Sequence, residues 1–252
     1  MKKYYYLLQT FTLGIVLLLF NSCGKKGDSV SPGSNGTGGS MARFAITGDY
    51  LYTLNNNSLR VFDISQPGNP VAGSNIAIGD GIETLFPYED KLFIGARAGM
   101  MIYDNKNPTK PEFISRYTHV TSCDPVVVQG KYAYVTLRDG TSCRNGSNLL
   151  DVLDISNLKT PIRVNTISLL HPHGLGIDGN DLFVSEGDFG LKVFNVSDPA
   201  HPRQTQFIQD VKTYDVIPQN KILLVTGKDG LYQYDYSDST QLKLLSTIPI
   251  AN

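Results

Sequence analysis

The stretch Leu59-Arg60-Val61-Phe62-Asp63-Ile64-Ser65 decides the fold, because its pattern returns four more times along the chain. Each copy is an apolar run that reaches an aspartate or asparagine anchor. The other copies are Met100-Met101-Ile102-Tyr103-Asp104-Asn105, Leu150-Asp151-Val152-Leu153-Asp154-Ile155-Ser156, Leu191-Lys192-Val193-Phe194-Asn195-Val196-Ser197 and Leu231-Tyr232-Gln233-Tyr234-Asp235-Tyr236-Ser237. The anchors at 63, 104, 154, 195 and 235 are 41, 50, 41 and 40 residues apart. This period is typical of the four-stranded blades of a β-propeller.

Each copy is preceded by a short apolar segment and a turn, and together they predict a β-hairpin. These preceding segments are 51–54, 92–94, 133–135, 182–184 and 223–225. Proline follows most copies, as in Asn107-Pro108-Thr109-Lys110-Pro111, and ends the strand because it lacks an N–H donor. One more short segment lies ahead of each hairpin. We therefore predict units of four antiparallel strands, a to d from the axis outward.

The predicted fold is all-β, a five-bladed β-propeller of four-stranded antiparallel blades over residues 41–252. Residues beyond 40 contain no long apolar pattern with the helical period, so we expect almost no helix there. The chain would begin on an innermost strand and end on an outermost one. We therefore expect no shared strand to close the ring, and the first and last blades to meet by side-chain packing alone.

The repeated pattern resembles the LVIVD-repeat family, bacterial β-propeller proteins that are often secreted or lipid-anchored. The resemblance covers most of residues 41–250, and the second, third and fourth units carry it most clearly. It implies a fold and a compartment, but the family has no single activity to carry over. Propellers of the WD type fit less well, because the chain has no tryptophan.

The N-terminus has the layout of a bacterial export signal. Lys2 and Lys3 precede an apolar stretch from Leu7 to Phe20, which is too short and too polar to be a comfortable membrane span. Cys23 resembles the lipid-accepting cysteine of a bacterial lipoprotein. We therefore expect residues 1–22 to be a cleaved signal peptide and Cys23 to be lipidated. The alternatives are an uncleaved anchor or an ordinary signal peptide followed by an incidental cysteine.

Residues 23–40 read as a flexible tether, since glycine, serine and other polar residues dominate them. Gly24 stands where an aspartate would resemble an inner-membrane retention signal, so an outer-membrane lipoprotein is favoured. Whether it faces the periplasm or the cell surface stays open. The predicted partners are the membrane, through the lipid anchor, and an unknown protein or glycan.

Charge argues against nucleic acid as a partner. The chain has 22 Lys and Arg against 23 Asp and Glu, and removal of residues 1–22 deletes two lysines and no acid, leaving 20 minus 23, or −3. The remaining basic residues are scattered, so they form no basic footprint.

Two cysteines lie in the predicted propeller. Cys143 is in the long insertion 138–148 that accounts for the 50-residue step, and Cys123 precedes the third hairpin. Because strands alternate in direction, the d-to-a and b-to-c connections share one face of the disc, which we call the top face. Cys123 and Cys143 can meet there, and an exported setting favours a disulfide. A metal pair or a reactive thiol is the alternative.

Candidate binding residues come from aligning the units on the start of strand b. The position nine residues earlier holds Ala42, Glu83, Asp124, His173 and Tyr214, one residue for each blade. Arg43, Asp215 and His171 adjoin this series. We expect these side chains to line a polar funnel at the mouth of the central channel, suited to a cation, a sugar or a short peptide. Solvated or hydrogen-bonded structural roles are the alternative for the same residues.

Other motifs indicate structure rather than chemistry. We expect the repeated anchors to cap turns, because a short carboxylate accepts from the backbone two residues on. The glycine-rich string 174–179 precedes a strand and not a helix, so it lacks the helix N-terminus that a dinucleotide site needs. We find no serine elbow, HExxH motif or phosphate loop, and we predict no catalytic residue, no metal site and no cofactor.

The sequence therefore predicts an exported, membrane-anchored β-propeller lipoprotein that acts as a binding module through its top-face loops. The runner-up is a periplasmic or surface enzyme, a hydrolase or lyase acting on sugars or lactone-like substrates at the channel mouth. Whether the protein is an enzyme stays open, with binding preferred.

Overall fold

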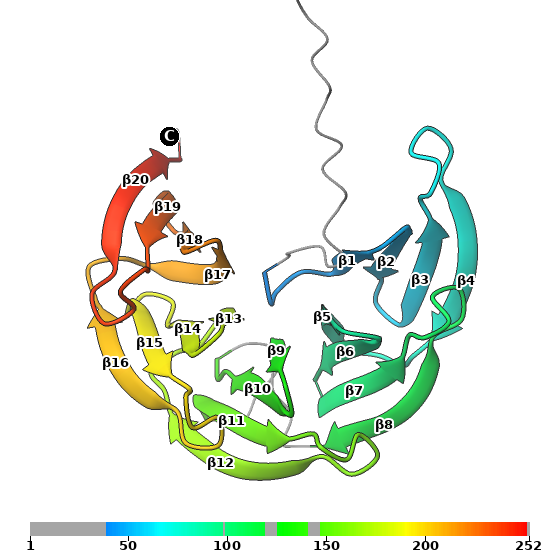
Figure 1. The fold of residues 1–252 in the computed structure, drawn as a ribbon, viewed down its shortest axis with the longest axis horizontal. Coiled ribbons are helices and arrows are strands. Elements are labelled where there is room, and N and C mark those ends of the chain that lie inside the picture. The colour runs from blue at the N-terminus through cyan, green and yellow to red at the C-terminus, as the bar shows by residue number, and fades with distance from the viewer. Residues whose placement is uncertain (1–38, 98, 119–124, 141–146, 251–252) are drawn as a thin grey trace, which may run out of the picture. The chain divides into compact units, whose positions relative to one another are not determined.

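The computed structural model describes residues 39–97, 99–118, 125–140 and 147–250, which all belong to one compact unit. The regular structure of these residues is β-strand, in five four-stranded antiparallel sheets, and the described part holds no helix. Figure 1 shows the sheets arranged as blades around one axis. The predicted all-β, five-bladed propeller is confirmed.

The strands of each blade follow one another in the chain. Blade 1 contains β1 (Phe44–Thr47), β2 (Tyr50–Leu54), β3 (Ser58–Asp63) and β4 (Val71–Ala77). Blade 2 contains β5 (Ile82–Tyr88), β6 (Lys91–Ala96), β7 (Gly99–Asp104) and β8 (Glu112–Thr118). Blade 3 contains β9 (Val126–Gln129), β10 (Tyr132–Leu137), β11 (Leu149–Asp154) and β12 (Ile162–Ser168). Blade 4 contains β13 (Leu175–Asp178), β14 (Asp181–Ser185), β15 (Leu191–Asn195) and β16 (Arg203–Ile208). Blade 5 contains β17 (Thr213–Gln219), β18 (Ile222–Gly227), β19 (Gly230–Asp235) and β20 (Lys243–Pro249).

The repeated anchors end the third strand of every blade and cap the turn that follows. The Asp63 carboxylate accepts a hydrogen bond from the Ser65 N–H at 2.8 Å, and Asp154 accepts from Ser156 at 2.7 Å. Asp104, Asn195 and Asp235 make the same contact two residues on. The predicted turn-capping role is confirmed, and it explains why a short carboxylate or amide recurs at this position.

Hydrophobic packing joins consecutive blades from blade 1 to blade 5, and the three middle blades are packed on both faces of their sheets. One buried cluster lies between blades 1 and 2, and further clusters lie between blades 2 and 3, 3 and 4, and 4 and 5. Alternate residues of one strand serve the two neighbours. In β14, for example, Leu182 packs toward blade 3 and Phe183 toward blade 5.

The expected packing of the first blade on the last is wrong. Five blades in a closed ring would need five interfaces, whereas the described residues form four hydrophobic clusters, none of which joins blades 5 and 1. Figure 1 shows these two blades on opposite sides of an open sector. The outward residues remain apolar but uncovered, and Phe44 on β1 is 58% exposed.

A short segment before β1 makes the link that the blades do not. Residues 39–42, here called the entry segment, lie among the innermost strands of three other blades. The Ser40 hydroxyl accepts from the Leu175 N–H at 2.7 Å and donates to the Asp215 carboxylate at 3.3 Å. The Leu85 N–H donates to the Ala42 carbonyl at 2.9 Å. The entry segment thus ties β13 and β17 to β5 across the centre of the propeller.

Candidate functional site

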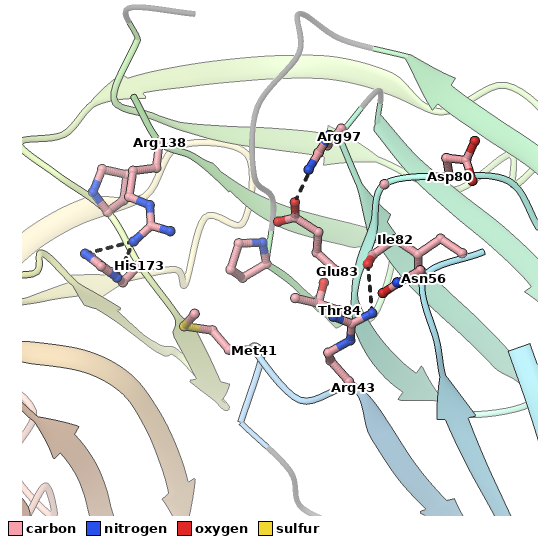
Figure 2. A pocket seen from close by; sticks show the side chains of 13 residues that line it. Met41, Arg43, Asn56, Asp80, Ile82, Glu83, Thr84, Arg97, Arg138 and His173 are labelled. Carbon is pink, nitrogen blue, oxygen red and sulfur yellow. Dashed lines mark hydrogen bonds and ion pairs between the residues drawn. The ribbon is translucent and has the colours of Figure 1, made fainter. Parts of the chain in front are cut away.

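A polar pocket opens on the top face beside the innermost strands, and Figure 2 shows the side chains that line it. Its volume is about 530 Å³, within the range of small-molecule sites. Side chains from the d-to-a and b-to-c connections line it together, as antiparallel blades require. The lining residues are Met41, Arg43, Asn56, Asp80, Gly81, Ile82, Glu83, Thr84, Arg97, Pro125, Arg138, Pro172 and His173.

The structure brings three of the predicted funnel residues into this pocket: Arg43, Glu83 and His173. The Arg43 guanidinium donates to the Ile82 carbonyl at 3.4 Å, and Glu83 lies 3.8 Å from Nε of Arg97. Asp124 lies outside the described residues, as do Cys23, Cys123 and Cys143. That the pocket binds a ligand stays a prediction.

His171 and Tyr214 lie around His173 rather than along the pocket wall. The His171 and His173 ring centroids are 5.0 Å apart, and Tyr214 lies 5.4 Å from His173. The three rings form an aromatic support beside the pocket. Because His173 is the member that lines the pocket, a change at His171 or Tyr214 would act through the position of His173.

Asp215 has a structural position, away from the pocket lining. Its carboxylate accepts from Ser40, from the Met41 N–H at 3.4 Å and from the Val216 N–H at 3.0 Å. A Cβ on Gly39 or Gly174 would lie 2.0 Å from its oxygens, so both glycines are needed for this close approach. Burial raises the pKa of Asp215 to about 6, although these hydrogen bonds favour the charged form. Asp215 therefore holds the entry segment.

Sequence reasoning missed two arginines that line the pocket, Arg97 and Arg138. Both lie at a second repeat position, five residues after the start of strand b, and aligning the units at this position would have identified them. That position holds Asn56, Arg97, Arg138, Gly187 and Lys228 in the five blades, and the first three line the pocket. The first turn after strand b therefore places one side chain for each blade at the mouth.

A buried ion pair fixes the loop that carries His173. Glu186 is fully buried and accepts from the Leu170 and His171 N–H groups at 3.0 and 2.8 Å. Its other oxygen lies 2.6 Å from Nζ of Lys192 on β15. Removing one partner of such a pair typically costs about 3–5 kcal/mol, because the other charge stays buried. Glu186 therefore has a positioning role.

The electrostatics around His173 favour a neutral imidazole. Burial and, to a smaller extent, the Arg138 charge lower the pKa of His173 to about 4. The Arg138 Nη1 lies 2.5 Å from Nδ1 and 3.0 Å from Nε2 of the ring. Burial also lowers the pKa of Arg138, while Glu83 acts in the opposite direction. A neutral imidazole can accept a hydrogen bond from a guanidinium, which explains the close approach.

Three further features of the described residues concern metal binding, membrane insertion and the glycine-rich string. No cluster of three or more His, Cys, Asp or Glu within them is arranged to hold a metal ion. In the same residues, no helix has the length and apolar character to cross a bilayer. In the glycine-rich string, a Cβ on Gly176 would lie 2.6 Å from Cδ of Pro218, so the glycine serves strand packing.

Structural comparisons find similar folds in proteins of diverse origin. The chain matches a protein of unknown function from Desulfotomaculum acetoxidans with a TM-score of 0.67 at 12% identity, covering 82% of this chain and 69% of that one. It matches the Pseudomonas aeruginosa periplasmic gluconolactonase PpgL with a TM-score of 0.60 at 17% identity, covering 81% and 68%. For BamB from Moraxella catarrhalis the TM-score is 0.52 at 15% identity, covering 81% and 59%.

These likenesses show the fold alone, and the chain spans about three fifths of BamB and about two thirds of the other two. No curated protein matches the sequence closely enough to count as a relative. The sequence profile of the LVIVD repeat, however, matches residues 38–76 and 122–167, which cover most of blades 1 and 3. The resemblance predicted from the repeated motif is thereby confirmed, and the protein is a five-bladed β-propeller in which two stretches match the LVIVD repeat.

Proposed function

We propose that this protein is an exported, membrane-anchored binding module that recognises its ligand at the top-face pocket. The pocket supports this proposal because side chains from four blades converge on one cavity of about 530 Å³. A rigid sheet scaffold with recognition groups on its connecting loops is a common design of binding proteins.

The test is a small-molecule and glycan panel, read by thermal shift and by NMR of the His173 ring. A ligand of the pocket should bind the wild type and Glu83→Gln with different affinities, because Glu83 lines the cavity. Gln233→Ala, on the uncovered face of blade 5, is the control and should bind as the wild type does. Ligands that bind the wild type and Glu83→Gln alike would place recognition elsewhere, for example on the insertion 138–148.

The second candidate is an enzyme acting on sugars or lactones at the same pocket. The fold likeness to a periplasmic gluconolactonase favours it as a class, and ionisable side chains line the cavity. Glucono-δ-lactone hydrolysis measured by proton release separates the two candidates. An enzyme should lose turnover in Glu83→Gln or His173→Gln while still binding the lactone. A rate equal to buffer alone for the wild type would reject the lactonase.

Anchoring follows from the sequence around Cys23. We propose cleavage before Cys23, lipidation of its thiol and residence in the outer membrane, facing the periplasm or the cell surface. Cys23→Ala should move the protein from the detergent phase to the aqueous phase, or leave it as an unprocessed precursor. Mass spectrometry of the wild-type N-terminal peptide checks the lipid directly. An unmodified peptide and equal partitioning of the two forms would reject the anchor.

The remaining proposal is a disulfide between Cys123 and Cys143 on the top face. Peptide mapping without reducing agent should recover a cross-linked pair. Closing a loop of this length stabilises by roughly 3 kcal/mol in the chain-entropy model, so reduction should lower the melting temperature by a few degrees. Two free thiols in exported protein would contradict the pairing.

A further inference from the structure

Three arginine side chains reach the pocket from three different blades. Arg43 comes just before β1, Arg97 follows β6 and Arg138 follows β10. Figure 2 shows Arg138 beside His173 on one side of the pocket, and Arg97 and Arg43 near Glu83 on the other. The guanidinium groups therefore lie on two opposite sides of the cavity.

The charge around the cavity is positive among the described residues that line it. Three guanidinium groups face two carboxylates, Asp80 and Glu83. Between pH 5 and 8 the fourth ionisable type, His173, adds no charge, because burial lowers its pKa to about 4. A ligand that brought negative charge would therefore balance the lining better than a neutral one or a cation.

The contacts of Arg43 and Arg97 orient these two guanidinium groups toward the cavity. A guanidinium has five N–H donors in a planar fork, a geometry that fits the two oxygens of a carboxylate or phosphate. Arg43 uses one N–H on the Ile82 carbonyl. The Arg97 guanidinium approaches Glu83 only at 3.8 Å and its side chain is half-exposed, so a second oxyanion has room to pair with it.

The lining also has an apolar part that suits a carbon skeleton. Met41, Ile82 and Pro172 contribute apolar surface between the charged groups. A bare inorganic ion would leave this surface in contact with water. A cavity of about 530 Å³ has room for a ligand of roughly monosaccharide size together with water.

We propose that the pocket binds a small organic anion, whose carboxylate or phosphate is held by Arg97 and Arg43 and whose body lies toward Arg138 and His173. This inference rests on the proposed function and names the ligand class of the same site. Arg97 determines the specificity for charge, because its side chain is half-exposed and its ion pair with Glu83 is long, at 3.8 Å.

The experiment compares three probes that share one sugar ring: galacturonate, galactose 1-phosphate and neutral galactose. Binding to the full protein is measured by calorimetry and by NMR of the His173 ring. We expect one or both acidic probes to bind at least tenfold more tightly than galactose, and the tighter one identifies carboxylate or phosphate as the preferred group. The bound anion should also raise the pKa of His173, an effect that galactose cannot produce.

The decisive variant is Arg97→Gln, with Lys228→Gln as the matched control. Lys228 occupies the same repeat position in blade 5, is exposed and does not line the pocket. Arg97→Gln should weaken binding of the acid about tenfold, equivalent to 1.4 kcal/mol, and leave galactose unaffected. Lys228→Gln should change neither.

Equal affinity for all three probes would overturn the anion inference without contradicting the proposal that the pocket binds a ligand. An equal loss in Arg97→Gln and Lys228→Gln would also overturn it, because the effect would then reflect net charge alone. Failure of all three probes to bind would overturn it as well. The proposed function would be lost only if its own panel also failed to distinguish Glu83→Gln from the wild type.

Discussion

The faces between neighbouring blades and the two terminal faces of the propeller carry apolar residues at the same repeat positions. These residues are buried between blades and more exposed on the terminal faces. Leu85, Val126, Leu175 and Val216 hold one position on the innermost strands of blades 2 to 5, and each is at most 1% exposed. Phe44 holds that position in blade 1 and is 58% exposed. On the other side of the open sector, Leu231 is half-buried, whereas its counterparts Leu59, Leu150 and Leu191 are fully buried.

The difference shows that burial here comes from the neighbouring blade and not from the blade itself. A lone sheet cannot cover both faces, so its outward apolar residues stay exposed until another sheet packs on them. The two terminal faces keep their apolar residues although nothing in the described structure covers them. Local sequence therefore specifies the blade, while the stability of each position depends on what lies next to it.

The largest expected effect tests this comparison with one substitution at two equivalent sites. Leu182→Ala removes a fully buried side chain between blades 3 and 4, and should lower the free energy of unfolding by about 2–5 kcal/mol. Leu51→Ala changes the same repeat position on the uncovered face of blade 1 and should cost only about 1 kcal/mol. Urea unfolding of the three proteins gives both values.

Equal costs at Leu182 and Leu51 would contradict the comparison. They would mean that the outward face of blade 1 is covered in solution, either by blade 5 or by another molecule. Sedimentation of the wild type would distinguish the two cases, because only the second changes the mass. Leu191→Ala and Leu231→Ala form the matching pair on the opposite faces, with the same expectation.

Much of this arrangement could be predicted from the sequence. The five anchors gave the strand order, the blade boundaries and the turn caps, because each depends on residues within one repeat. Aligning one repeat position brought Glu83 and His173 toward the same cavity. Arg97 and Arg138 needed only a second aligned position, so they too lay within reach of sequence reasoning.

The open sector and the role of Asp215 were not accessible in the same way. Ring closure depends on the angle between neighbouring blades, which is set by packing summed over every interface and not by any single motif. Asp215 adjoins a funnel position in the sequence, and this neighbourhood predicts a place in the funnel. Its actual partners, Ser40 and Met41, lie about 175 residues earlier, and no local pattern points to them.

A second prediction concerns the pH dependence of stability. The entry segment, and not a fifth interface between blades, links the two ends of the propeller, and the titratable Asp215 holds this segment. The pKa of Asp215 is raised to about 6 by burial, so the folded state binds this proton more tightly than the unfolded chain does. The contribution of this bound proton to the free energy of unfolding is therefore full below pH 4 and is lost as pH rises through 6. His173 acts in the opposite sense, since its lowered pKa costs stability as pH falls from 6.5 toward 4.

Asp215→Asn separates the two groups by removing only the first titration. Relative to the wild type, the free energy of unfolding of Asp215→Asn should rise by roughly 2 kcal/mol between pH 4 and pH 7. Thermal melts of both proteins across this range provide the measurement. A difference that stays constant with pH would show that Asp215 titrates normally, and that the entry segment does not bury it in solution.

The smallest expected effect tests whether the entry segment connects the two ends mechanically. Ser40→Ala removes the hydroxyl that accepts from the buried Leu175 N–H, and should cost about 1–2 kcal/mol, since that donor loses its partner. Ser197→Ala is the control, because its hydroxyl bonds only the Asn195 side chain on an exposed turn.

Hydrogen exchange read at individual amides gives the decisive observation. In Ser40→Ala the Leu85 N–H in blade 2, which donates to Ala42, should exchange faster together with Leu175 in blade 4. Faster exchange at Leu175 alone would mean that the segment binds each blade separately, and that the propeller holds its shape through its four inner interfaces without any tie across the centre.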